Sequence, residues 1–313
     1  MPPDLLELTE FVSLTPNRTL GIPIALVGAV FLSLGAQFQH RGVGKVGVSS
    51  LARESTALSV GQLLQLLSRP SWVIGTLLLG LAIVFQLTSL YLAPLIVVQP
   101  LGAVALVITA VVNARVSKVP LSWAAIRAIV LCVVGVALFV TIAAFTATSS
   151  PISENQLVIV LVILGVVTAA FSVAFGFLRK RFKAIIYIVG AGVLYGFVAT
   201  LAKVVIDRIK TLVLFGSDTG GFEWLTAACV VALLAATALG GYFVQSAYSS
   251  GPPDLVIAGL TVVDPIVAVC IGVVVLQEAA GAPLWAIVAF VVSGVVAVYG
   301  VFQLAEHHPQ VRG

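Results

Sequence analysis

The sequence is poor in charge. Only 9% of its 313 residues are Asp, Glu, Lys or Arg, whereas 60% are hydrophobic and the mean hydropathy is +1.18. Soluble domains carry about 25% charged residues. Because 12 acidic and 16 basic residues cannot cover a water-exposed surface of this size, the composition excludes a soluble enzyme, a nucleic-acid-binding protein and a disordered chain. The net charge of +4 is therefore interpreted in relation to a membrane surface.

Cysteines and catalytic motifs are also scarce. The 3 cysteines lie in apolar runs without metal-site or disulfide spacing, and we expect them to pack as small apolar side chains: Cys132, Cys229 and Cys270. The sequence contains no glycine-rich phosphate loop and no Ser/His/Asp set, so we expect neither an enzyme nor a bound cofactor. Residues 1–19 hold three acids and one base, the reverse of a basic secretory signal, so we expect no signal peptide.

Long apolar runs are what the sequence has in abundance. Each is close to the roughly 20 residues that cross a hydrocarbon core of about 30 Å, and none shows the polar alternation of barrel strands. The sequence therefore predicts an all-α integral membrane protein with about nine transmembrane helices. We expect them at 20–40, 71–92, 94–114, 122–147, 156–178, 184–206, 222–248, 254–276 and 282–304.

One charged stretch between the first two spans has a different pattern. Leu63, Leu64 and Leu67 recur at helical spacing in a segment that also contains Arg53 and Glu54. This pattern predicts an amphipathic helix at about 46–68 that lies in the membrane interface.

The basic residues of the loops predict the orientation. With the N-terminus outside, twelve Lys and Arg fall on the inner side and four on the outer side. Because basic loops stay in the cytoplasm, we expect the N-terminus out and the C-terminus in. The N-terminal segment 1–19 shows no transit signature, so we expect a multi-pass protein of the bacterial plasma (inner) membrane. Residues 306–313 are expected to form a C-terminal tail.

Two parts of the chain resemble one another. The segment from Phe85 through Pro100 to Asn113 is echoed from Phe243 through Pro265 to Glu278, with equal spacing after the prolines. The third and eighth spans run in opposite directions, so the repeats are inverted. We expect a first repeat of four spans (20–148) and a second of five (149–305), an arrangement in which transporters often bind solutes at mid-membrane.

These residues resemble a known group of transporters. The segment 92–103, LAPLIVVQPLGA, resembles the signature of the NIPA magnesium transporters, as do Ser33–Gly35 and Gln39–Gly42 in the first span. The segment 258–265 and the pair Gln277-Glu278 resemble an EamA repeat of the drug/metabolite transporter (DMT) superfamily. The resemblance implies a secondary transporter built from inverted repeats. At Gln86 the sequence departs from the glutamate of the NIPA pattern, which weighs against magnesium.

Asp264 is the acid placed deepest in a predicted span. An ionised acid at the centre of a membrane helix costs about 2.5–3.5 kcal/mol, which indicates a function. Pro265 removes one helix hydrogen bond, so we predict a helix break that exposes the carbonyl of Thr261. Asp264 is thus a candidate cation, proton or metal site. The alternative is a structural ion pair with Lys203.

Other polar side chains occupy related positions. Gln99 precedes Pro100 as Asp264 precedes Pro265, so we expect a second helix break there. We predict one central solute or ion pathway, with interhelical hydrogen bonds as the alternative role of each residue. Besides Asp264, its predicted residues are Gln99, Gln86, Gln245, Tyr91, Tyr195 and Tyr248.

Three further features are interpreted as structural. Lys203 and Asp207 are predicted to form a surface ion pair, and Glu278 to be an interfacial charge. Gly192-x-x-x-Gly196 and the similar motif at Gly165 are predicted to allow close contact between helices.

The sequence favours a secondary transporter of DMT type that moves a small polar or cationic solute by alternating access. A NIPA-like transporter of magnesium is the alternative, and a non-transporting membrane partner or lipid-handling protein is a third possibility. We expect a small molecule or cation and the lipid bilayer as partners and no nucleic acid, and the sequence leaves a homodimer open.

Overall fold

A computed structural model describes residues 16–47, 69–118, 120–148, 152–178, 184–215, 223–250 and 253–306, and these residues form helices and connecting turns without any strand. The elements are α2 (Pro16–Gly47), α4 (Pro70–Leu92), α5 (Leu95–Val98), the 3-10 helix η1 (Gln99–Gly102), α6 (Ala103–Ser117), α7 (Trp123–Thr146), α8 (Glu154–Leu178), α9 (Ala184–Phe215), α10 (Glu223–Ser250), α11 (Pro253–Val274) and α12 (Leu284–Glu306).

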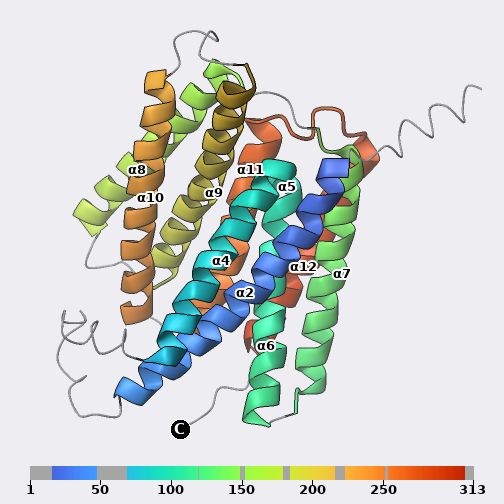
Figure 1. Ribbon diagram of the computed structural model, residues 1–313, viewed down its shortest axis with the longest axis vertical. Coiled ribbons are helices and arrows are strands. Elements are labelled where there is room, and N and C mark those ends of the chain that lie inside the picture. The colour runs from blue at the N-terminus through green and yellow to red at the C-terminus, as the bar shows by residue number, and fades with distance from the viewer. Residues whose placement is uncertain are drawn as a thin grey trace, which may run out of the picture.

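The predicted membrane spans are confirmed as helices. The described residues contain 9 helical segments long and apolar enough to cross a membrane, and α5, η1 and α6 together form one of them, Leu95–Val116. The spans alternate in direction, so α2 begins at one end of the bundle and α12 ends at the other (Figure 1). Nearly all of the predicted interfacial segment 46–68 lies outside the described residues.

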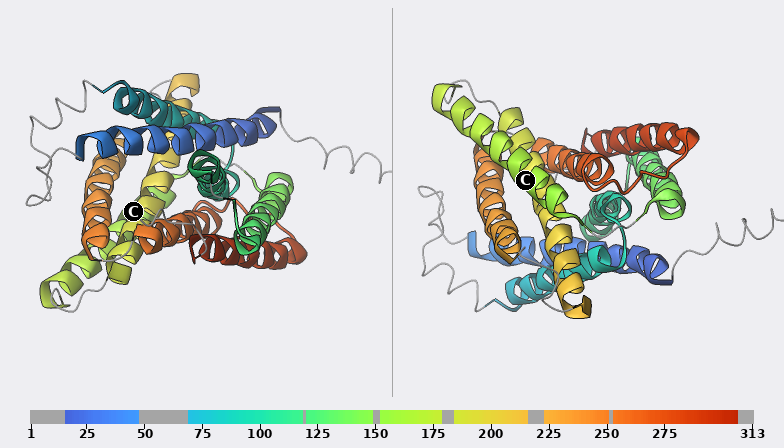
Figure 2. Two further views of the ribbon diagram at one scale, coloured as in Figure 1. Left: turned by 90° about the horizontal axis from the view of Figure 1, so that it is seen from below. Right: turned by 90° about the horizontal axis from the view of Figure 1, so that it is seen from above.

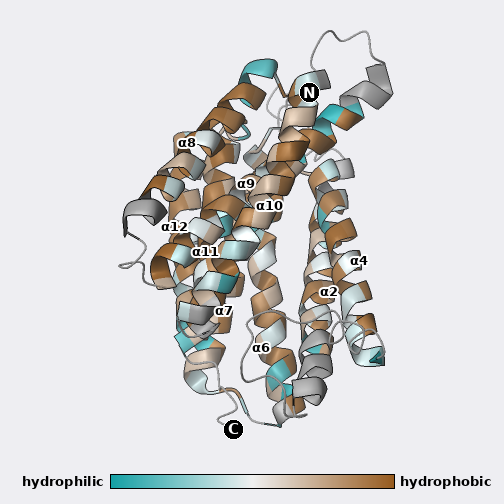
Figure 3. Cartoon of the chain, turned by 90° about the vertical axis from the view of Figure 1, so that its left-hand side faces the viewer, coloured by the Kyte–Doolittle hydropathy of each residue, from teal (hydrophilic) through white to brown (hydrophobic). Residues whose placement is uncertain are grey.

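The spans differ in how deeply they are buried within the bundle. In the most apolar stretch of the span Leu95–Val116, 56% of the residues are buried, whereas the corresponding share in Glu154–Val173 is 17%. Figure 2 looks along the bundle and shows α6 among the other helices and α8 at the edge. Large apolar side chains such as Leu77 and Val166 are each 64% exposed. Hydrophobic residues recur along the helices in Figure 3, and an exposed apolar surface of this kind suits a hydrocarbon surrounding.

Glycines set the closest helix contacts. On α2, Gly21, Gly28 and Gly35 recur every seven residues and face α4: a Cβ at Gly21 would lie 2.6 Å from the Cβ of Ala93. Gly135 of α7 and Gly300 of α12 meet the backbone of the other helix in the same way. Since lipid gives little hydrophobic drive for helix association, such close backbone packing is a main source of stability.

The predicted contact at Gly192 and Gly196 is confirmed. A Cβ at Gly192 would lie 2.6 Å from the Cβ of Val263, and one at Gly196 would lie 2.7 Å from that of Val267. These glycines bring α9 directly against the part of α11 that carries Asp264. At Gly165 a Cβ would meet nothing within 4 Å among the described atoms, so the close contact predicted there is wrong.

We expect Gly192→Val to lower the melting temperature of the purified protein clearly, because the new side chain pushes α9 away from α11. Overpacking of this kind costs about 1–3 kcal/mol. Gly165→Val is the matched control, since the same change there meets open space and should leave the melting temperature almost unchanged. Equal melting temperatures of the two variants would contradict the packing described.

Candidate functional site

A sharp turn, here called the break, separates the helices α4 and α5. The helix α4 ends at Leu92, Ala93 adopts an extended conformation with φ −131° and ψ 157°, and α5 starts after Pro94. Each helix end leaves backbone groups without an intrahelical partner. The break joins two successive spans, Pro70–Leu92 and Leu95–Val116, and its buried backbone groups need protein partners.

Lys203 satisfies the α4 side of this break. Its Nζ donates hydrogen bonds to the backbone oxygens of Leu90 at 2.7 Å and Ala93 at 3.2 Å. The same Nζ forms a salt bridge with Oδ1 of Asp207 at 3.2 Å. The predicted ion pair is thus confirmed, but its predicted place at the surface was wrong, because Lys203 is only 4% exposed.

Glu278 satisfies the α5 side. Its Oε1 accepts a hydrogen bond from the backbone N–H of Leu95 and its Oε2 accepts one from that of Ile96, both at 2.8 Å. Glu278 is 5% exposed, so the prediction of an interfacial charge was also wrong. Burial raises the pKa of Glu278, while the two amides and the ammonium of Lys203 act in the opposite direction.

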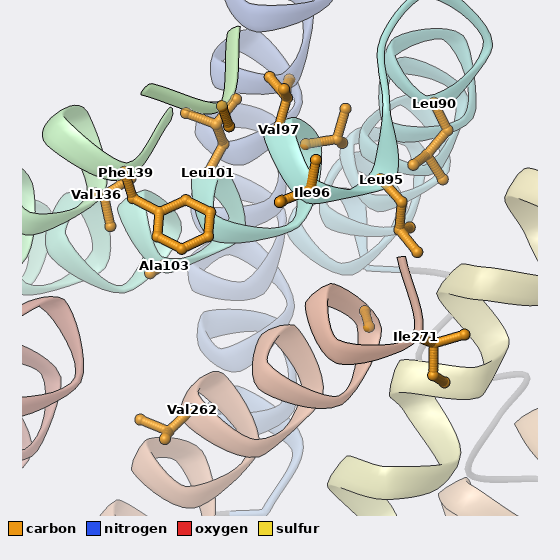
Figure 4. Close-up of a cluster of buried hydrophobic side chains, with 14 of the residues drawn as sticks. Leu90, Leu95, Ile96, Val97, Leu101, Ala103, Val136, Phe139, Val262 and Ile271 are labelled. Carbon is orange, nitrogen blue, oxygen red and sulfur yellow. The ribbon is translucent and has the colours of Figure 1, made fainter. Parts of the chain in front are cut away.

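The turn after α11 places the Glu278 carboxylate. Gln277 adopts a left-handed backbone with φ 57°, and the N–H of Glu278 donates to the oxygen of Gly272 at 2.9 Å. A Cβ at Gly272 would lie 3.0 Å from Oε2 of Glu278, so only glycine leaves the carboxylate its full room. We call Lys203, Asp207 and Glu278 the charged cluster. The break lies next to a buried apolar cluster that includes Leu95 and Ile96, which Figure 4 draws.

A cavity of about 540 Å³ lies between helices of both halves of the chain. Its walls come from α2 and α4 on one side, α9 and α11 on the other, and η1. It is lined by Ala25, Gly28, Ala29, Leu32, Ala82, Ile83, Gln86, Leu87, Leu90, Gln99, Gly102, Tyr195, Val198, Ala199, Ala202, Leu260, Thr261, Asp264 and Pro265.

The cavity brings together four of the seven predicted pathway residues: Gln86, Gln99, Tyr195 and Asp264. Gln99 lies on η1 and is 6% exposed. The Oδ1 atom of Asp264 is buried and has no hydrogen-bond partner among the described residues. Lys203 is held by Leu90, Ala93 and Asp207, so the structural pair of Lys203 with Asp264 is not formed.

The structure corrects one of the two predicted helix breaks, the one at Pro265. Pro265 lies inside α11, which continues to Val274, so the break predicted there is wrong. A helix tolerates such a proline when neighbouring groups take up the freed carbonyl. At Pro100 the α-helix of the span Leu95–Val116 is interrupted by the 3-10 helix η1, whereas Ala93 and Pro94 form the turn that joins this span to α4.

Two further predicted pathway residues, Gln245 and Tyr91, do not line the cavity. Gln245 is exposed on α10, and Tyr91 is 44% exposed with its ring centroid 4.9 Å from Nζ of Lys210. Both were placed by symmetry and residue type, which do not reveal which face of a helix turns inward. The side chain of Tyr248 lies outside the described residues. Thr261, which sequence reasoning considered only for its carbonyl, lines the cavity beside Asp264.

The described residues contain no group of three or more His, Cys, Asp and Glu side chains able to hold a metal ion. Within the cavity, Asp264 is the carboxylate of the described lining. The site therefore offers one acid, two amides and two hydroxyl groups.

The chain resembles a protein of Corynebacterium glutamicum over most of its length. The chain is 26% identical over 269 residues to an uncharacterized protein of Corynebacterium glutamicum, an alignment that covers 84% of this chain and 86% of that protein. No family model matches the sequence. No solved structure matches it significantly. The nine apolar helices among the described residues make the chain a polytopic, multi-pass integral membrane protein.

Proposed function

We propose that the protein is a secondary transporter of DMT type that moves a small polar or cationic solute by alternating access. The observation that supports it most is the cavity itself: a buried, unpartnered carboxyl oxygen and two glutamines face a space of about 540 Å³. Ligand cavities of proteins have volumes of about 300–1,000 Å³ with a few convergent polar groups.

The position of the cavity supports the same function. Gln86 and Gln99 come from the first predicted repeat, and Tyr195 and Asp264 from the second. Secondary transporters with inverted repeats bind solutes where the repeats meet, beside discontinuous helices. The α-helix of the span Leu95–Val116 is interrupted by η1, which carries Gln99.

The packing of the helices is compatible with an inverted repeat. If α2 corresponds to α9 and α4 to α10, the pairs α2–α4 and α9–α10 are equivalent, and both pack extensively. If α7 corresponds to α12, the two helices exchange places under the same symmetry and the contact between them maps onto itself. This contact is also extensive. The orientation with the N-terminus outside and the C-terminus inside stays part of the proposal and rests on the basic residues of the loops.

A NIPA-like transport of magnesium has less support. Mg²⁺ keeps several waters and is usually held by carboxylates, often with phosphate groups of a substrate. The described lining offers the single carboxylate of Asp264, and Gln86 supplies an amide where the NIPA pattern has an acid.

Alternating access can be tested without knowing the solute. In a background with Cys132, Cys229 and Cys270 replaced by alanine, Ala199→Cys places one thiol in the cavity lining. We expect a membrane-impermeant thiol reagent to label this cysteine from either side of oriented vesicles, because both open states occur.

Val166→Cys provides the control for this labelling. Val166 is 64% exposed on α8 and does not line the cavity, so its thiol should lie in hydrocarbon and remain unlabelled from both sides. Labelling of Ala199→Cys from one side only, under all conditions, would argue for a non-transporting membrane protein.

A further inference from the structure

The cavity combines one acid with a mainly apolar wall. Its described lining includes one carboxylate, Asp264, and the polar side chains of Gln86, Gln99, Tyr195 and Thr261. The other lining residues are alanine, glycine, valine, leucine, isoleucine and proline. The polar groups come from α4, η1, α9 and α11, whereas the part of the wall formed by α2 is entirely apolar.

The acid requires a positive partner that the described protein groups do not supply. Oδ1 of Asp264 is buried and accepts no hydrogen bond. The nearest candidate on α9, Lys203, already bonds to Leu90, Ala93 and Asp207. A buried charge is costly unless it is paired. A solute with one positive charge would supply the missing partner.

The apolar wall requires an apolar solute body. A small hydrated ion would direct its waters at alanine and leucine side chains, which cannot accept or donate hydrogen bonds. A divalent ion would in addition face one carboxylate where such ions usually gather more. An organic group instead gains by removing this wall from water.

The aromatic ring of Tyr195 is positioned to contribute. It is seated against α10, where a Cβ at Gly240 would lie 3.4 Å from its Cζ atom. The missing side chains at Gly240 and Gly241 thus leave room for the ring beside the cavity. Aromatic faces attract organic cations, and Tyr is among the better rings for this contact.

We infer that the solute of this cavity is an amphipathic organic cation with one positive charge, such as a protonated or quaternary amine on an apolar body. Its charge is bound by Asp264, its body packs against the α2 and α4 wall, and Gln86 and Gln99 orient it. This inference rests on the proposed function and specifies the substrate class of that same site.

The test compares probes of similar shape and different charge. Binding of labelled N-methyl-4-phenylpyridinium to the full-length protein in nanodiscs is measured, with competition by unlabelled compounds. Methyl viologen has a similar shape with two charges, tetramethylammonium has one charge without the aromatic body, and 4-phenylpyridine at mildly alkaline pH is uncharged. Magnesium chloride is tested alongside.

We expect the singly charged probe to bind at least about tenfold more tightly than each competitor. Asp264→Asn should lose this binding, whereas Gln245→Leu, on the exposed face of α10, should retain it. Equal or tighter binding of methyl viologen, magnesium or tetramethylammonium would overturn the inference, as would unchanged binding in Asp264→Asn.

The inference and the proposed function fail in different ways. Two-sided labelling of Ala199→Cys without binding of the cation would leave the transporter in place and overturn its substrate class. Binding of the cation with labelling from one side only would support the site and overturn alternating access.

Discussion

Asp264→Asn is expected to abolish uptake of the cationic probe into proteoliposomes while leaving the melting temperature equal to or above that of the wild type. Oδ1 of Asp264 is buried without a hydrogen-bond partner, so the wild-type carboxyl contributes nothing to the packing of α11 that an amide cannot replace. Removing a buried charge also removes its desolvation cost.

The loss of uptake follows from the loss of charge. The attraction between two unit charges about 4 Å apart is about 4 kcal/mol at an effective dielectric constant of about 20, which corresponds to roughly a thousandfold change in affinity. An amide of the same shape lacks this attraction for a cation. Gln245→Leu serves as a control for reconstitution, because Gln245 does not line the cavity and its replacement should leave uptake intact.

The melting temperature separates function from structure. If Asp264 stabilised the fold through a pairing with a lysine, Asp264→Asn would melt several degrees lower and lose uptake through misfolding. Lower stability together with lost uptake would therefore support the structural alternative. Full uptake at unchanged stability would remove Asp264 from the pathway altogether.

The sequence was sufficient for the spans because each depends on local composition. Apolar runs of membrane length predict helices whatever their neighbours are. The contact at Gly192 could likewise be predicted, since small residues four apart form a flat helix surface. The same motif at Gly165 was wrong because the pattern shows that a helix can be approached closely and not that a neighbour is there.

The site was predicted in part, for a reason of geometry. Asp264, Gln86 and Gln99 stand out because polar groups are costly within a span. Which of them share a cavity depends on helix rotation, and this placed Gln245 and Tyr91 outside. The charged cluster was misinterpreted because Glu278 and Lys203 contact backbone atoms more than one hundred residues away.

Lys203→Met is expected to destabilise the protein strongly. The change leaves the backbone oxygens of Leu90 and Ala93 without their donor and the carboxylate of Asp207 without its cation. Removing one partner of a buried ion pair costs about 3–5 kcal/mol. We expect a large fall in melting temperature in detergent, with Asp207→Asn recovering part of it when combined with Lys203→Met, because the acid that has lost its salt bridge with Lys203 is then removed.

Lys210→Met is the matched control on the same helix. Lys210 contacts the exposed ring of Tyr91, and an exposed cation–π contact contributes only about 0.5–1 kcal/mol. If Lys203→Met melted no lower than Lys210→Met, the charged cluster would not hold the break between α4 and α5. A specific loss at Lys203 would show that a buried lysine and a buried glutamate hold the break between two successive spans. That break sets the position of η1, and with it the side chain of Gln99 in the cavity.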